Sequence, residues 1–443
     1  PSYFLESFSK SCEFFRMNGC HSSETHEHGV HRFLSDNPED DCELIIRDLE
    51  TQGKGWVDIL TVLENVNFDW KRINDSGILS GNEVILDLAL IQQAGANPVI
   101  ELQAMLKLLK SFKENNIEKI YVHFALDSQV FLQVAKLRAA RVMIETLQKD
   151  VGLGVVKFMC SPSKSYFTQY ETSTNMLRNV AACSAAMMGG ADIIVLDNYI
   201  DAADENFWRQ TRNTYHVLND ESALNAVSDP ARGSLLMESV TDYLIQTSYQ
   251  EFKKDLATSL SDFLQRVSIE CNKLAKVRQE LVETGKLVLV GVNNYANPND
   301  SVEEKLDFHQ TDLFPLQKPS VRLESLRSAL QDKPLSLGLY SFGELKSVFE
   351  RINFAQNFFE ILGKPVEHTH FNDFELKTGH ETAIIICALD EDYEKLKSQI
   401  GAIKKPVFII SREVQIDDTH LVYRGVNMIE LFKKSLKVVE EVL

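Results

Sequence analysis

Residues 120–160 read IYVHFALDSQVFLQVAKLRAARVMIETLQKDVGLGVVKFMC, and this stretch decides the fold class. It opens on a short run of β-branched and aromatic residues and closes on a second run at residues 155–160. Between the two runs, apolar residues recur at spacings of three and four, as on one face of a helix: Val130, Val134, Leu137, Ala140, Ile144 and Leu147. The stretch therefore predicts a strand, a helix and a parallel strand, the repeating unit of α/β proteins.

The same alternation continues on both sides of this stretch. Upstream, residues 83–90 predict a strand and residues 99–115 a helix; downstream, residues 175–188 predict a helix and residues 192–197 and 287–292 predict strands. Strands joined by crossover helices favour a TIM-type (β/α) barrel, although periodicity alone leaves an open sheet possible. The first 80 residues show only weak patterns, so we expect a barrel that is truncated or irregular at its start.

A domain boundary is expected where this alternation stops. From Asn293 to about Pro334 the sequence is polar with scattered prolines, as a linker would be. Helix and strand patterns then return in five segments, 342–362, 383–388, 391–400, 407–410 and 428–442. They predict a small doubly wound domain. We therefore divide the chain into a barrel domain at residues 1–300, a linker at 301–334 and a second α/β domain at 335–443.

The composition argues against nucleic-acid and membrane partners. The chain carries 46 Lys and Arg against 64 Asp and Glu, a net charge of −18, and it has no long basic run to neutralise a phosphate backbone. The uncharged apolar stretch at residues 179–191 is well short of the roughly 20 residues that span a bilayer. The seven cysteines are scattered, with no Cys-x-x-Cys pair, and the first residues lack a secretory signal. We expect reduced thiols and a cytoplasmic location.

No candidate for metal binding or catalysis stands out from the residues alone. Two histidine-rich segments could supply zinc ligands, residues 20–31 and the group His368, His370 and His380 near Asp373, but polar loops would look the same. No complete phosphate-binding motif or nucleophile elbow occurs. Three arginines remain, Arg178, Arg209 and Arg212, and the last of them lies near a presumed strand end, where barrel loops build their sites. Solvated or structural roles explain them equally well.

Five short motifs together resemble the methylmalonyl-CoA mutase family. They are QQAGA at residues 92–96, AKLRAAR at 135–141, RNT at 212–214, SDP at 228–230 and VGVN at 290–293. Each is unspecific alone, but their order and spacing match the family across residues 83–300. The resemblance implies a TIM-barrel domain followed by a flavodoxin-like domain of the cobalamin-binding type, here in degenerate form.

The resemblance also implies that the catalytic groups are missing. In catalytic members a Tyr-His pair stands just before the motif that matches QQAGA, and the phenol and the imidazole lie beside the migrating thioester. Ala89 and Leu90 occupy those positions here. Aliphatic groups cannot donate a hydrogen bond to a carbonyl, so we expect no catalytic residue in this chain. Arg178 and Arg212 remain as vestigial substrate-side positions.

The cofactor motif of the family is absent as well. Its Asp-x-His-x-x-Gly sequence supplies the histidine that coordinates cobalt and the aspartate that orients it, and no such sequence occurs here. The segment that matches Asp-Pro-Trp-Gly-Gly-Ser reads DPARGS at residues 229–234. The second domain is also predicted to start with a helix, where the strand and loop of the motif belong. We therefore expect this chain to bind no cobalamin, and adenosylcobalamin to reside in a partner.

These losses resemble the small chain of heterodimeric bacterial mutases. The first hypothesis is a non-catalytic small subunit that stabilises a large, cobalamin-carrying subunit, in a complex that interconverts methylmalonyl-CoA and succinyl-CoA. The second is a competent acyl-CoA mutase in which Arg178, Arg212 or Tyr166 has taken over substrate contacts. The third is a stand-alone binding module.

Overall fold

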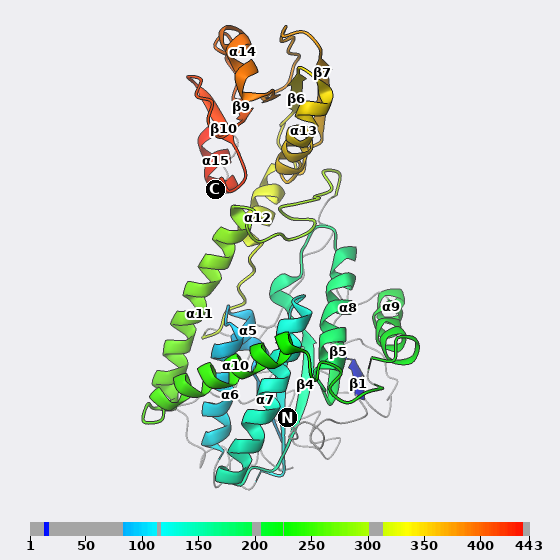
Figure 1. The fold of residues 1–443 in the computed structure, drawn as a ribbon, viewed down its shortest axis with the longest axis vertical. Helices are drawn as coiled ribbons and strands as arrows, with labels where there is room; N and C mark the ends of the chain where they lie inside the picture. The colour runs from blue at the N-terminus through cyan, green and yellow to red at the C-terminus, as the bar shows by residue number, and fades with distance from the viewer. Residues whose placement is uncertain are drawn as a thin grey trace. The chain divides into compact units, whose positions relative to one another are not determined.

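The computed structural model describes residues 13–16, 83–112, 117–196, 205–224, 226–300 and 313–436 (Figure 1). The chain forms two compact units. Unit 1 comprises residues Pro1–Phe167, Asn175–Ala275 and Leu306–Lys318, and unit 2 comprises Thr168–Thr174, Lys276–Lys305 and Pro319–Leu443. Each unit contains one parallel β-sheet, so the predicted α/β class with parallel strands is confirmed. The predicted domain boundaries stay a prediction.

The sheet of unit 1 has five strands in the order β1-β5-β4-β3-β2, all of them parallel. Their bounds are β1 Glu13–Arg16, β2 Glu83–Asp87, β3 Lys119–Leu126, β4 Val155–Pro162 and β5 Ile193–Leu196. Among the described strands, β1 and β2 form the two edges and do not pair with each other. The described strands therefore do not close into a barrel.

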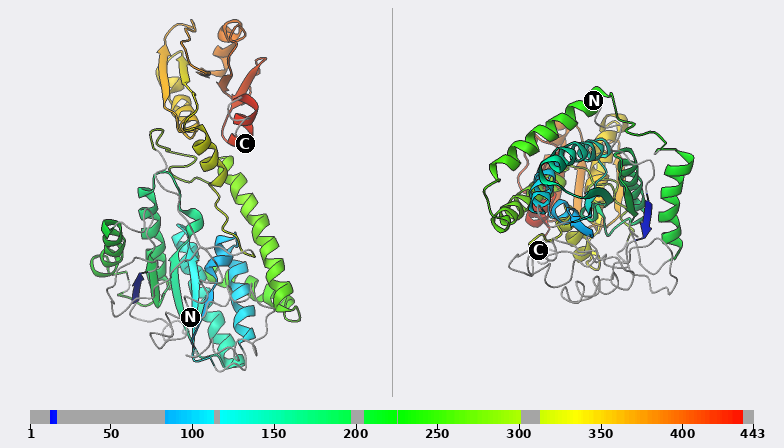
Figure 2. Two further views of the ribbon diagram at one scale, coloured as in Figure 1. Left: turned by 180° about the vertical axis from the view of Figure 1, so that it is seen from behind. Right: turned by 90° about the horizontal axis from the view of Figure 1, so that it is seen from below.

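Seven α-helices accompany this sheet along the chain. They are α5 Ala89–Gln93, α6 Pro98–Ser111, α7 Val130–Val151, α8 Ser173–Met188, α9 Glu205–His216, α10 Leu235–Lys254 and α11 Leu260–Glu283. The side chain of Asn97 accepts a hydrogen bond from the backbone N–H of Ile100 and so caps α6, whose first residue is a proline. Helices α6, α7 and α10 pack against one another, with α10 (green) crossing the other two (Figure 2).

The two faces of this sheet bury different sets of side chains. Because side chains alternate along a strand, Val122, Phe124 and Phe158 share one face and join the large apolar core with the helices. The opposite face carries a small cluster that includes Tyr121 and Met159. Further along the same strands, towards their carboxyl ends, the residues of this second face become polar.

Unit 2 contains the second parallel sheet, in the order β10-β9-β8-β6-β7. Its strands are β6 Leu337–Phe342, β7 Val366–Phe371, β8 Ala383–Cys387, β9 Val407–Ile410 and β10 Thr419–Val422. The helices of this part are α12 Val321–Leu330, α13 Leu345–Glu360, α14 Tyr393–Ile400 and α15 Met428–Ser435. Phe359 of α13 lies at the centre of an aromatic cluster, with ring centroids 4.9 Å from Phe408 and 5.7 Å from Phe432.

Several predicted elements are wrong. Residues 287–292 form no strand, because Gly291 adopts a positive φ of 83° and a tight loop follows. Helix α12 lies within the predicted linker, and its three leucines are buried. The second domain begins with strand β6 and not with a helix. The first predicted strand ends three residues early, since the Asp87 carboxylate accepts a hydrogen bond from the N–H of Ala89 and helix α5 begins there.

Candidate functional site

A chain of buried polar side chains crosses the carboxyl ends of three neighbouring strands in unit 1. Asp87 ends β2 and pairs in register with His123 on β3. The carboxylate Oδ1 lies 2.8 Å from Nδ1 of His123, and Nε2 of the same ring lies 2.8 Å from the Ser161 hydroxyl on β4. A carboxylate only accepts hydrogen bonds, so Nδ1 carries the ring hydrogen and donates a hydrogen bond to Asp87. The three side chains therefore form one continuous hydrogen-bonded row.

A second group of polar side chains lies just beyond the strand ends. The Ser163 hydroxyl donates to Oε1 of Gln92 at 2.7 Å and lies 2.8 Å from the Ser165 hydroxyl. All three residues are buried. Gln92 belongs to the QQAGA stretch, so this motif supplies an acceptor to the loop that follows β4.

The row from Asp87 to Ser161 has the order of a catalytic carboxylate, imidazole and hydroxyl. A serine nucleophile must meet a substrate carbonyl and needs hydrogen-bond donors for the developing oxyanion. Asp87, His123 and Ser161 are only 3%, 4% and 4% exposed, and Ser161 lies within a regular strand. A buried polar network that fixes the strand ends explains this geometry better than hydrolysis.

The two positions that should hold the family's catalytic pair lie next to this network. Ala89 and Leu90 form the first turn of α5 and are buried. Their side chains offer only aliphatic carbon, so they contribute packing and no hydrogen bond.

The structure does not bring the two candidate arginines into this network. Arg178 lies on α8 and donates from Nη1 to Oδ1 of Asn175, one turn earlier on the same helix, at 2.7 Å. Arg212 was expected near a strand end, but it is an exposed residue of helix α9. Polar residues dominate this segment, so the sequence alone does not predict helix α9.

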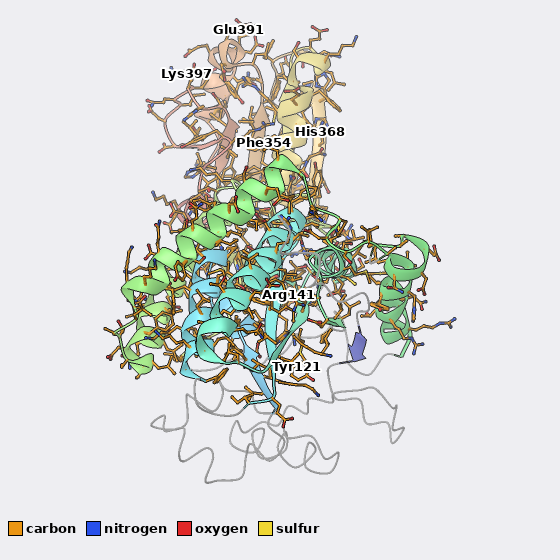
Figure 3. The ribbon with its side chains drawn as sticks, turned by 60° about the horizontal axis from the view of Figure 1, so that its bottom comes forward. Tyr121, Arg141, Phe354, His368, Glu391 and Lys397 are labelled. Atoms are coloured by element: carbon orange, nitrogen blue, oxygen red, sulfur yellow. The ribbon has the colours of Figure 1, made fainter. Side chains whose placement is uncertain are left out.

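The arginines of the AKLRAAR stretch make structural contacts within unit 1. Arg138 on α7 makes two hydrogen bonds with the Asp229 carboxylate, at 3.0 and 3.1 Å, and so joins residues 135–141 to the SDP motif. The guanidinium of Arg141 lies 3.8 Å from the ring centroid of Phe158 on β4 (Figure 3). Both arginines are buried, so they hold the helix to its surroundings.

Gly95, the glycine of QQAGA, allows helix α11 to approach the end of α5 closely. Its φ is +117°, and a Cβ at this position would lie 2.5 Å from the carbonyl oxygen of Cys271 and 2.9 Å from Cβ of Ala275. Real Cβ atoms do not approach other heavy atoms that closely, so only glycine fits without a shift of α11.

Gly95→Ala is expected to lower the free energy of unfolding by about 1–3 kcal/mol more than Gly152→Ala, because only the first substitution overpacks the structure. Gly152 is a matched control: its φ is +72°, but a Cβ there would meet nothing within 4 Å. The measurement is urea unfolding of both variants, followed by circular dichroism. Equal losses would contradict the close packing at Gly95.

The carboxyl ends of β8 and β9 in unit 2 are bridged by an ion pair. Arg351 of α13 donates to the carbonyls of Ala388 and Ile410 and makes two hydrogen bonds of 2.9 Å to the Asp390 carboxylate. The Ser411 hydroxyl donates to the same carboxylate at 2.7 Å. The hydrogen bond from Arg351 is the main reason why the pKa of Asp390 is lowered. The pair occupies the strand ends of this sheet.

The second histidine group lies partly on a strand that was not predicted. His368 and His370 belong to β7, and the Ser341 hydroxyl on β6 lies 2.9 Å from a ring nitrogen of each. Burial, followed by the neighbouring His370, lowers the pKa of His368. His380 and Asp373 are exposed residues outside the strands.

The residues that the structure describes contain neither a cluster of metal ligands nor a helix that could cross a membrane. In these residues, no three His, Cys, Asp or Glu side chains come together as metal ligands would. None of the described helices has both the length and the apolar character to cross a bilayer. The histidine-rich segment 20–31 lies outside the described residues, so the metal prediction for it stays open.

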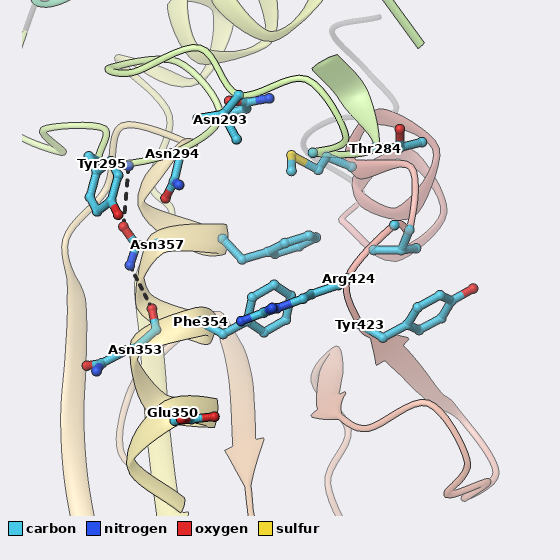
Figure 4. Close-up of a pocket in the computed structure, with 16 residues that line it drawn as sticks. Thr284, Asn293, Asn294, Tyr295, Glu350, Asn353, Phe354, Asn357, Tyr423 and Arg424 are labelled. Atoms are coloured by element: carbon cyan, nitrogen blue, oxygen red, sulfur yellow. Dashed lines mark hydrogen bonds between the residues drawn. The ribbon is translucent and has the colours of Figure 1, made fainter. Parts of the chain in front are cut away.

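Unit 2 also contains a cleft of about 590 Å³ that sequence reasoning missed (Figure 4). Three segments far apart in the sequence form it: the loop after α11, the exposed side of α13, and the loop between β10 and α15. The side chains include four asparagines, several aromatic rings, one carboxylate and one guanidinium, among them Asn294, Asn353, Phe354, Glu350 and Arg424. Loop residues from three distant segments show no common pattern in a sequence, which is why the cleft could not be predicted.

Comparison with known proteins now gives this architecture a family. Residues 81–357 match the family model described as Methylmalonyl-CoA mutase. A methylmalonyl-CoA mutase of Cereibacter sphaeroides is 27% identical over 261 residues, which cover 54% of this chain and 36% of that protein.

Two small-subunit proteins are also similar. The "probable methylmalonyl-CoA mutase small subunit" of Mycobacterium bovis is 31% identical over 196 residues, 41% of this chain and 31% of that protein. The methylmalonyl-CoA mutase small subunit of Streptomyces virginiae is 32% identical over 185 residues, 38% of this chain and 30% of that protein. The chain spans about a third of the length of these relatives. Because the family match covers more than half of its residues, this chain belongs to the methylmalonyl-CoA mutase family.

Proposed function

We propose that this chain is a non-catalytic small subunit of a methylmalonyl-CoA mutase and stabilises a large catalytic subunit in a heterodimer. One observation carries the proposal: Ala89 and Leu90 are aliphatic and buried, and the polar groups beside them bond to one another. A site for a thioester would need donors that point at its carbonyl oxygen. The interconversion of methylmalonyl-CoA and succinyl-CoA then belongs to the complex.

The same proposal includes a degenerate barrel and a flavodoxin-like second domain. In a barrel one face of every strand points inward, and the small cluster around Tyr121 and Met159 is the kind of side-chain layer that fills such an interior. In unit 2, with β6 as the first strand, the order becomes 2-1-3-4-5, the order of flavodoxin-like sheets.

We also place adenosylcobalamin in the partner and not in this chain. Only Gly343 and Glu344 connect β6 to α13, so the strand end offers neither a histidine for cobalt nor an aspartate to orient it. In a sheet of this order a ligand would sit outside the carboxyl ends of β6 and β8, and the pair of Arg351 and Asp390 lies at the end of β8. These residues do not fit the cofactor.

The cytoplasmic location belongs to this proposal as well. Four of the seven cysteines lie in the described residues, and all four are buried and not joined to one another by disulfides: Cys160, Cys183, Cys271 and Cys387. Burial raises the pKa of the Cys387 thiol, which keeps it protonated and poorly reactive. Buried free thiols are typical of a reducing compartment.

The test is turnover of methylmalonyl-CoA with adenosylcobalamin by this chain, by the large chain of the same organism, and by their mixture. We expect no turnover by this chain alone and a gain on mixing. A partner present at about 100 times its Kd should also stabilise the large chain by about 2.7 kcal/mol, seen as a higher Tm. Turnover by this chain alone would contradict the proposal and favour a competent mutase. No effect of mixing on either activity or Tm would favour a stand-alone module.

A further inference from the structure

The cleft of unit 2 is lined by polar side chains that are not used to hold the fold together. Asn294, Glu350, Asn353 and Arg424 make no side-chain hydrogen bond or ion pair with any described residue. This contrasts with the strand ends of both units, where the polar groups bond to one another. Polar groups gathered in a cleft without protein partners are available to a ligand.

The walls that carry these groups are fixed by hydrogen bonds. The buried Asn293 side chain accepts from the N–H of Leu289 and donates to the carbonyls of Val282 and Leu287, so the loop after α11 is held in place. Asn357 of α13 accepts a hydrogen bond from the N–H of Tyr295 in the same loop.

The third wall is tied to the first through a carboxylate. Glu283, at the end of α11, accepts two hydrogen bonds from Arg322 and one from Asn427, the residue that caps α15. Since each wall is anchored, the cleft is preformed, and a ligand would not have to order it.

The chemistry of the lining differs from one part of the cleft to the next. Figure 4 shows Arg424 extending across the cleft towards the ring of Phe354. Asn353 and Glu350 lie on the same helix as this ring, within one turn of it. Arg412, beside the cleft, lies over the ring of Tyr423, 5.6 Å from its centroid, and lines a shallower groove that continues from the same residues.

Each of these groups fits one part of a nucleotide. A guanidinium can bind phosphate oxygens in a bidentate manner, and it places a positive charge in a chain whose net charge of −18 would otherwise repel an anion. An aromatic ring offers a stacking surface to a base. An asparagine amide can pair with an adenine edge through one donor and one acceptor, and a carboxylate accepts from an exocyclic amine. A volume of about 590 Å³ lies in the range of small-ligand sites.

We propose that this cleft binds an adenine nucleotide, with the base against Phe354 and the phosphates on Arg424 and towards Arg412.

The experiment is isothermal titration of the full chain with ADP and, separately, with adenosine. We expect saturable binding of ADP and at least tenfold weaker binding of adenosine. Arg424→Gln should weaken ADP at least tenfold and leave adenosine unchanged, since adenosine has no phosphate for the guanidinium. Phe354→Leu keeps an apolar side chain but removes the stacking surface, so it should weaken both ligands alike.

Arg232→Gln is the matched control, because it removes one exposed positive charge in unit 1 and should leave ADP binding unchanged. Arg424 is exposed, and an unchanged circular dichroism spectrum and Tm would show that its variant is folded. Competition by coenzyme A would distinguish a nucleotide end of a larger cofactor from a free nucleotide. The proposal is overturned if ADP gives no saturable heat, or if Arg424→Gln and Arg232→Gln bind ADP equally.

Discussion

Lys136→Met should lower the free energy of unfolding by about 3–5 kcal/mol, because it removes one charge of a fully buried ion pair. Lys136 is 0% exposed, and its ammonium donates to Oε2 of Glu101 at 2.9 Å and to the carbonyl of Ala125 at 2.9 Å. Glu101 is 1% exposed, so water cannot replace the lost ammonium. Urea unfolding followed by circular dichroism measures the loss.

A double substitution separates the loss of the charge from the loss of packing. In Lys136→Met/Glu101→Gln neither charge remains, so we expect much of the lost stability to return. Lys273→Met, at an exposed site on α11, is the control and should change stability by about 0.5 kcal/mol or less. If the double variant were as unstable as the sum of its single variants, the loss would come from packing and not from the stranded carboxylate.

Phe359→Ala should destabilise unit 2 by about 3–5 kcal/mol, through the loss of buried area and the cavity that remains. This ring is fully buried, and it contacts the rings of Phe358, Phe408 and Phe432. The contacts join α13, β9 and α15, so the substitution removes the ring that packs these three elements together. Thermal unfolding followed by circular dichroism should show a lower Tm.

The same helix supplies the matched control for this substitution. Phe349 lies on α13 but is 55% exposed, so Phe349→Ala makes the same chemical change without opening a cavity. We expect a change of about 0.5 kcal/mol or less. Similar effects at the two positions would mean that the aromatic cluster around Phe359 does not stabilise this unit.

Much of the fold could be predicted, because strong periodicity reflects burial directly. The six apolar residues spaced along residues 130–147 place one face of α7 in the core, and the helix runs from Val130 to Val151. The β-branched runs at residues 120–124 and 155–160 are strands, and β3 and β4 extend them by a few residues; β3 is buried on both faces, and β4 is so from Phe158 onward.

The errors arose where side-chain hydrogen bonds or exposure override this pattern. Residues 287–292 are rich in valine and leucine, but the Asn293 side chain takes up backbone groups that a strand would pair with a neighbour. Strand β7, with the sequence VEHTHF, lies at the edge of its sheet and is half exposed, so its polar residues resemble a loop.

The site could have been predicted in part. Asp87 and His123 each lie at or near the carboxyl end of a predicted strand, and parallel strands bring such ends together. The sequence therefore contains enough information to place these two residues side by side. It could not have shown that Ser161 completes the row, because the relative shift of β3 and β4 is set by packing.

The polar rows at the strand ends of unit 1 have an evolutionary consequence. An active site usually keeps polar groups strained or unsatisfied until substrate arrives, and this lowers the stability of the folded enzyme. Here the Asp87–His123–Ser161 row and the Gln92–Ser163–Ser165 group satisfy one another before any ligand binds. Under the proposed non-catalytic function, the fold is released from that trade-off between activity and stability, and it can accumulate substitutions at these strand ends, provided that each one still packs and still closes its hydrogen bonds.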